Sequence, residues 1–216
     1  MIGILLALQV NNWNEWRKDR KIEKQLLFDL KRDLESNLNR IESDVQLLQN
    51  INRVNKIVLS SIEQKLPYSD SLDVHFGIPL WLIDFKYRFK NVGYDGLINS
   101  GLDLIESDSL KKEIVGLFAG TYGETLEFVN DININEYQLR QYMANNFHNY
   151  FCKTCMDSEM IRYRPINPIK TMSDNYFRSV LFELINHAEG HIEILNAVQS
   201  ESKRVLQLIM VELGDE

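Results

Sequence analysis

Residues 30–67 read LKRDLESNLNRIESDVQLLQNINRVNKIVLSSIEQKLP, and this stretch decides the fold. Its apolar residues recur at spacings of mostly three and four, the period of an amphipathic helix; they are Leu30, Leu34, Leu38, Ile41, Val45, Leu48, Ile51, Val58 and Ile62. Neither proline nor glycine occurs between Trp13 and Ile62, so we expect one helix of roughly 75 Å that Leu66-Pro67 closes. Asn52 and Asn55 interrupt the stripe. A seam asparagine can fix register, but we expect both at solvated positions.

Two further long helices are expected downstream. The first runs from Leu110 to about Phe151, and its Gly116-x-x-x-Gly120 pair indicates close helix approach or a kink. The last follows Ser173, a plausible N-cap, with apolar steps that alternate four and three and so predict a bundle or coiled-coil seam; its stripe is Phe177, Leu181, Leu184, Ala188, His191, Leu195, Val198, Ser202, Val205 and Ile209. The proline-bearing segment 152–172 reads as irregular.

The aromatic segment 78–89, IPLWLIDFKYRF, predicts a short helix, with a strand as the alternative because Phe85, Tyr87 and Phe89 alternate with cations. Together these patterns predict an all-α fold. A long N-terminal, membrane-proximal helix packs with two further long helices and a short helical layer as an antiparallel bundle.

The N-terminus, residues 2–24, places an apolar run before aromatic and basic residues. The run IGILLALQV leads into Trp13 and Trp16, and then into cations, in the order of a membrane helix that enters the interface. The residues expected at a membrane interface are Trp13, Trp16, Arg17, Lys18, Arg20 and Lys21. Nine residues of helix cover roughly 14 Å, about half a bilayer core. We therefore expect residues 1–16 to be the end of a truncated transmembrane helix, with an interfacial anchor or a core helix as alternatives, and residues 17–216 to form a single helical-bundle domain.

Two segments resemble a known family. The opening, GILLALQVNNWNEWRKDRKIEK, is similar to the start of a family of uncharacterised membrane proteins from Bacteroidota, the domain of unknown function DUF6090. A second similarity covers Tyr94 to Gly101, YDGLINSG, and the Asp108-Ser109-Leu110 that follows. The resemblance implies further apolar residues and a basic segment upstream, and it implies no activity. In this chain we expect Tyr94 to be buried and Gly101 to adopt a positive φ at a helix end.

The charge distribution argues against nucleic acid as a partner. The chain carries a net charge of −7, but residues 1–24 hold five Lys or Arg against three Asp or Glu, which leaves −9 for the rest. Binding phosphates requires clustered cations, and the basic cluster lies where a membrane would be. The expected partners are therefore the lipid bilayer and a protein partner or second copy. We expect a bacterial inner-membrane location, with the side of the membrane left open and an extracytoplasmic body favoured.

One constellation could carry chemistry. Cys152 and Cys155 follow His148 at successive spacings of four and three, while His187 and His191 share a helical face, as metal ligands on helices do. These five residues could form a zinc site. The cysteines could instead form a disulfide, or all five could be ordinary structural residues. No phosphate-binding loop or nucleophile elbow is present, so enzyme activity is not indicated and we expect no cofactor unless zinc binds.

The expected function is therefore that of a membrane-anchored helical protein, a scaffold or protein-interaction module. The alternative is a metal-binding or thiol-redox protein that uses the cysteine and histidine set. The two differ in bound zinc and in the number of free thiols.

Overall fold

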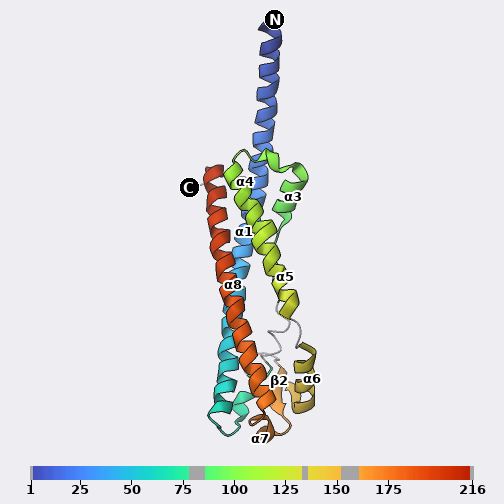
Figure 1. Ribbon diagram of the computed structural model, residues 1–216, viewed down its shortest axis with the longest axis vertical. Helices are drawn as coiled ribbons and strands as arrows, with labels where there is room; N and C mark the ends of the chain where they lie inside the picture. The colour runs from blue at the N-terminus through green and yellow to red at the C-terminus, as the bar shows by residue number, and fades with distance from the viewer. Residues whose placement is uncertain (1, 78–85, 133–135, 152–160, 215–216) are drawn as a thin grey trace. The chain divides into compact units, whose positions relative to one another are not determined.

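The computed structural model describes residues 2–77, 86–132, 136–151 and 161–214, which are mostly helical (Figure 1). The two long helices are α1 (Ile2–Glu63) and α8 (Asn175–Leu213). Shorter elements lie between them in the chain: η1 (Asp70–Leu72), α3 (Val92–Ser100), η2 (Leu102–Leu104), α4 (Asp108–Val115), η3 (Gly116–Thr121), α5 (Tyr122–Ile132), α6 (Glu136–Asn146), β1 (Phe147–Phe151), β2 (Ile161–Pro165) and α7 (Pro168–Thr171). The predicted helical architecture is confirmed, with a small β-hairpin added to it.

Contacts between Cα atoms divide the chain into two compact units, and each unit contains a section of α1 and a section of α8. Unit 1 is Met1–Ile41, Arg88–Thr125 and Ala197–Glu216, and unit 2 is Glu42–Tyr87 and Leu126–Asn196. The single domain expected at residues 17–216 stays a prediction beside this division. Each unit is described by itself below.

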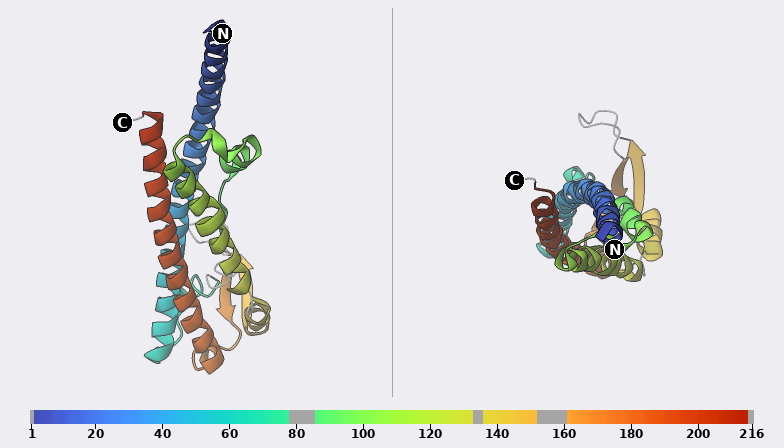
Figure 2. Two further views of the ribbon diagram at one scale, coloured as in Figure 1. Left: turned by 45° about the horizontal axis from the view of Figure 1, so that its top comes forward. Right: turned by 90° about the horizontal axis from the view of Figure 1, so that it is seen from above.

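In unit 1, α1 packs with α4, η3 and the end of α8 (Figure 2). The buried side chains come from all of these elements and include Leu27, Leu30, Leu34, Ile114, Leu117, Val198, Val205 and Ile209. Rings also stack within the unit: Tyr94 lies face to face with Phe118 at 5.0 Å, and Phe89 with Tyr122 at 4.1 Å. Tyr94 was expected to be buried, and it is half-buried through this stacking.

Buried polar side chains of α1 fix where the segment from Lys90 to Glu106 lies on it. Asn37 forms two hydrogen bonds with the backbone of Lys90, of 2.7 and 2.9 Å. The Asp33 carboxylate accepts from the Gly93 N–H at 2.7 Å, and the Glu23 carboxylate accepts from the Glu106 N–H at 2.8 Å. A buried carboxylate is costly unless it is hydrogen-bonded, so these bonds strongly favour one register of the segment.

Two glycines of this segment are needed for different reasons. A Cβ on Gly93 would lie 2.7 Å from the backbone of α1, so only glycine permits this approach of α3. Gly101 follows the end of α3 with φ 107°, and its N–H donates to the Leu97 carbonyl, so the expected positive φ is confirmed. Ser107 caps the N-terminus of α4, since its hydroxyl accepts from the Leu110 N–H at 3.2 Å.

In unit 2, α1 and α8 run antiparallel. Ion pairs join Glu63 to Arg178 at 2.8 Å and Lys56 to Glu189 at 2.7 Å, so residue numbers fall on one helix as they rise on the other. The core also takes side chains from η1, α6 and β1; its members are Val58, Leu59, Ile62, Leu72, Phe76, Leu139, Met143, Phe147, Phe177, Leu181 and Ile185. The apolar stripe predicted for the last helix is thereby confirmed over its first turns.

The β-hairpin of unit 2 is held by one buried carboxylate. β1 and β2 pair antiparallel, from Phe147 opposite Pro165 to Phe151 opposite Ile161. Asp73, which lies just after η1, accepts from the hydroxyls of Tyr68 and Tyr150 and from Arg164 Nε, the last two at 2.8 Å. These hydrogen bonds and burial raise the pKa of both tyrosine hydroxyls. Asp73 thus joins both strands to the loop that follows α1.

Three expectations about local structure are wrong. Asn52 and Asn55 are buried, at 8% and 0% exposure, because their face of α1 packs inside unit 2. The helix expected at residues 110–151 differs in two places: a π-helix occupies Gly116–Thr121, and Phe147–Phe151 is a strand, while residues 133–135 lie outside the described residues. No atom of a neighbouring element lies within 4 Å of a Cβ built on Gly116 or Gly120, so close helix approach is wrong for these glycines, while the alternative expectation of a kink stays a prediction.

The proline-bearing segment was expected to be irregular, yet residues 161–165 form β2 and residues 168–171 form α7. A strand pair is defined by its partner, which the local pattern does not show. Of the aromatic segment 78–89, residues 78–85 lie outside the described residues, and residues 86–89 form neither helix nor strand.

Candidate functional site

The first section of α1, residues 2–16, is here called the anchor segment. Its large apolar side chains are exposed on every side of the helix, between 51% and 69%; they are Ile4, Leu5, Leu6, Leu8, Val10, Trp13 and Trp16. From Gly3 onward, where the side chains of α1 are described, the first buried one is that of Glu23. The anchor segment therefore takes no part in the core of unit 1, although the same helix supplies that core further on.

The six residues expected at a membrane interface do not share one environment. Trp13 and Trp16 are exposed, and the Arg17 guanidinium lies over the Trp13 ring, 5.3 Å from its centroid. Lys18 and Lys21 are exposed, and no described residue pairs with either. Arg20 differs, because it bonds Glu23, Glu106 (2.8 Å) and the Leu104 carbonyl (2.9 Å). Arg20 thus serves the fold of unit 1, which its position in a basic cluster did not indicate.

Among the described residues, no helix combines the length and the apolar character required to cross a membrane.

The structure describes the three histidines of the proposed zinc site but not its two cysteines. Cys152 and Cys155 lie outside the described residues, so neither the zinc site nor the disulfide is tested. His148 lies exposed on β1 and His187 is exposed on α8, whereas His191 is buried. The described part of the chain holds no cluster of three or more histidine, cysteine or acidic side chains that could bind a metal.

His191 instead belongs to a buried pair in unit 2. Its Nδ1 shares a hydrogen bond of 2.6 Å with the Tyr87 hydroxyl. Burial, with a smaller contribution from the charge of the neighbouring His187, lowers the pKa of His191 from its ordinary 6.5 to about 4. Burial raises the pKa of Tyr87, and the Asp44 carboxylate adds to that rise. Both groups are therefore neutral at pH 7.

Two asparagines of α1, Asn52 and Asn55, are also buried in unit 2. The Asn52 amide donates to Glu189 at 3.3 Å, whereas both side-chain atoms of Asn55 are without a hydrogen-bond partner among the described residues. An unpaired buried amide costs on the order of 1–3 kcal/mol. The periodicity of the stripe could have shown both positions as buried, since Asn55 lies seven residues after Leu48 and seven before Ile62.

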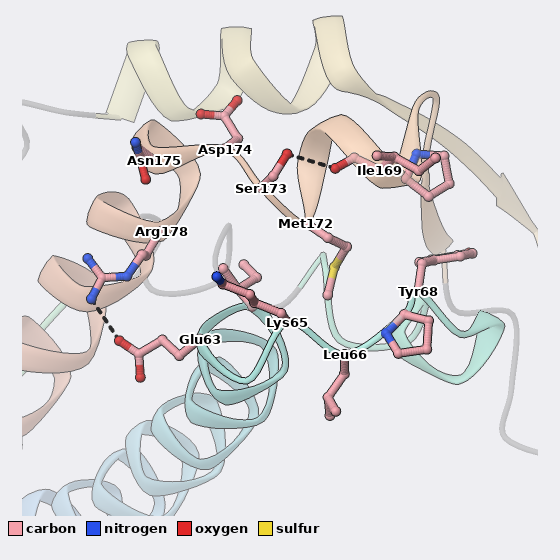
Figure 3. Close-up of a pocket in the computed structure, with 13 residues that line it drawn as sticks. Glu63, Lys65, Leu66, Tyr68, Ile169, Met172, Ser173, Asp174, Asn175 and Arg178 are labelled. Atoms are coloured by element: carbon pink, nitrogen blue, oxygen red, sulfur yellow. Dashed lines mark hydrogen bonds and ion pairs between the residues drawn. The ribbon is translucent and has the colours of Figure 1, made fainter.

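A pocket of about 560 Å³ lies in unit 2 where α1 ends and α8 begins, and we call it the turn pocket (Figure 3). Its lining comes from the end of α1 and the turn after it, and from α7 and the start of α8; it consists of Ile62, Glu63, Lys65, Leu66, Pro67, Tyr68, Pro168, Ile169, Met172, Ser173, Asp174, Asn175 and Arg178. The two groups of residues are about a hundred positions apart in the chain, so sequence reasoning missed the pocket.

The wall of the turn pocket contains a helix end with an unusual residue. Lys65 adopts φ 53°, in the left-handed region that glycine favours. Its N–H donates to the Ile62 carbonyl and the Leu66 N–H donates to the Ser61 carbonyl, both at 3.0 Å. This is the Schellman arrangement of a helix C-terminus. It directs the chain away from α1 and brings Leu66 and Pro67 to the pocket.

Comparison of the chain with protein-family models, with curated proteins and with solved structures found no match. The proposals that follow therefore rest on the chain's own residues.

Proposed function

We propose that this protein is a membrane-anchored helical scaffold, tethered through the anchor segment, with a body that serves protein interaction. The single observation that supports the anchor is the all-round exposure of seven large apolar side chains on residues 4–16. Burial of a large apolar side chain contributes roughly 1.5–3 kcal/mol, so transfer of this segment from water into a membrane would be favourable by on the order of 10 kcal/mol.

The order of residue types supports one orientation of the anchor. The apolar run lies at the N-terminal end, Trp13 and Trp16 follow it, and the unpaired cations Lys18, Lys21 and Lys24 come next. In the proposal the run enters the hydrocarbon, the tryptophans lie at the interface, and the lysines face the headgroups. Arg20 is not needed for this contact because it is bonded within unit 1.

The interaction role rests on apolar side chains exposed on unit 2. Phe151 and Ile161 face each other across the hairpin at 66% and 48% exposure, and Phe182 of α8 is 53% exposed. Exposed apolar side chains that lie together, as Phe151 and Ile161 do, are typical of surfaces that another chain covers. The partner in this proposal is another protein or a second copy of this chain.

Vesicle flotation tests the anchor. The full chain is mixed with vesicles of zwitterionic and anionic phospholipid, and its recovery in the floating fraction is measured. We expect native protein to float and the Leu5→Asp/Leu8→Asp variant to stay at the bottom, because charged side chains cost several kcal/mol in hydrocarbon. The matched control is Val92→Asp/Val211→Asp, which alters two side chains of unit 1 that are exposed by 68% and 69%. Equal flotation of the two double variants would overturn the proposal.

A further inference from the structure

The turn pocket has the size and the lining of a site for a small molecule. Its volume of about 560 Å³ falls within the range of roughly 300–1,000 Å³ that small-molecule sites occupy. Its wall is mainly apolar, with Ile62, Leu66, Pro67, Tyr68, Pro168, Ile169 and Met172 among its residues. Leu66 and Ile169 are exposed by 47% and 86% although both are large and apolar. An aliphatic chain could cover this surface.

Most of the charges around the turn pocket are already compensated. Glu63 and Arg178 form an ion pair of 2.8 Å (Figure 3). The Asp174 carboxylate accepts from the Tyr142 hydroxyl at 2.8 Å and from the Tyr176 N–H at 2.9 Å, at the start of α8 where the helix dipole favours a negative charge. These three groups therefore offer little attraction to a charged ligand.

Lys65 is the exception. It lines the pocket, and the described part of the structure gives its ammonium group no hydrogen bond and no ion pair. Figure 3 shows its side chain in the space between the end of α1 and the segment from Met172 to Arg178. The charge available to a ligand is thus positive and lies beside an apolar wall.

We propose that the turn pocket binds a single-chain aliphatic carboxylate, with its chain against the apolar wall and its carboxylate beside the Lys65 ammonium. This site is separate from the proposed membrane anchor, because its lining residues all belong to unit 2 and the anchor segment belongs to unit 1. A carboxylate fits better than an alcohol because Lys65 supplies charge, and better than an amine because the pocket's carboxylates are already bonded.

The test uses decanoate, 1-decanol and decyltrimethylammonium below their aggregation limits, with the full chain at pH 7. Binding is followed by NMR through the methyl groups of Ile62 and Met172, which line the pocket. Because these methyl signals report on the pocket alone, they distinguish binding there from binding of amphiphiles to the anchor segment. We expect saturable shifts with decanoate. Its affinity should exceed that of decanol about threefold, as for an exposed ion pair, and that of octanoate roughly tenfold, for two buried methylenes.

Four variants check the assignment. Lys65→Gln should remove the preference for decanoate over decanol, while Lys170→Gln, an exposed lysine outside the lining, should keep it. Leu66→Glu, at an exposed position that tolerates charge, should abolish decanoate binding and retain decyltrimethylammonium. Met172→Trp should fill the cavity and abolish the Ile62 shift with every probe.

Two results would overturn the inference. One is the absence of saturable shifts at Ile62 and Met172 with decanoate. The other is decanoate binding that Leu66→Glu and Met172→Trp leave unchanged. The Leu5→Asp/Leu8→Asp variant should bind decanoate at these methyl groups like the native protein, so loss of membrane binding and loss of the pocket are read separately.

Discussion

Acidification should destabilise this protein through His191. The imidazole is 4% exposed, and its Nδ1 is bonded to the Tyr87 hydroxyl at 2.6 Å. Burial lowers its pKa from 6.5 to about 4 in the folded protein. The unfolded chain therefore takes up a proton before the folded one does, and stability is lost as the pH falls from about 6.5 to about 4.

The size of the effect follows from the two pKa values. At pH 7 both states hold a neutral imidazole, so His191 adds almost no pH dependence there. At pH 5 the unfolded state is almost fully protonated at this residue and the folded state is not. The linkage relation then gives a loss of about 2 kcal/mol in the free energy of unfolding, and on the order of 3 kcal/mol at pH 4.

Urea unfolding at pH 7 and pH 5 measures this loss. His191→Asn removes the titrating group while it keeps an acceptor near the position of Nδ1. Native protein should lose about 2 kcal/mol more than this variant between the two pH values. Half-buried His75, whose pKa burial also lowers, titrates in both proteins and cancels in the comparison.

The matched control is His187→Asn, an exposed histidine one turn earlier on α8. It should follow native protein closely, apart from a small rise in the pKa of His191. If native protein and His191→Asn lost equal stability on acidification, the buried neutral imidazole would not be the cause and the reasoning would be refuted.

Three further predictions concern single positions and are checked by thermal or urea unfolding. Gly93→Ala should lower the free energy of unfolding by about 1–3 kcal/mol, because its Cβ would lie 2.7 Å from the backbone of α1. The control Gly96→Ala should be tolerated, because its Cβ would meet its nearest neighbour at 3.7 Å. Equal effects of the two substitutions would contradict the close approach. Asp73→Asn should lower the free energy of unfolding by roughly 2–4 kcal/mol, because it weakens the hydrogen bonds to Arg164 and Tyr150. The control Asp70→Asn, at an exposed carboxylate, should change stability by less than about 0.5 kcal/mol. If Asp73→Asn left stability unchanged, other contacts would hold the hairpin. Lys65→Gly should raise the free energy of unfolding by about 0.5–1 kcal/mol, because glycine accepts φ 53° without strain. A loss of stability would mean that the lysine side chain stabilises the turn.

The amino-acid sequence by itself determined the two long helices and the exposure of the apolar side chains at the N-terminus. Both α1 and the stripe of α8 follow from periodicity without proline, because the repeat of a helix is a local property. The exposure of residues 4–16 was readable because apolar side chains on every side of a helix cannot all face one core. The positive φ of Gly101 was also predictable, since it depends on neighbours within a few residues.

Only the tertiary structure decided which residues meet across the chain. Tyr87 pairs with His191, and Arg20 bonds Glu106, although the local pattern shows neither partner. β2 exists because β1 lies opposite it, and the turn pocket exists because residues near 65 and near 170 close on one another. Such contacts join segments that lie between about ten and about a hundred residues apart, and their free energy depends on packing partners that a single stretch of sequence does not contain.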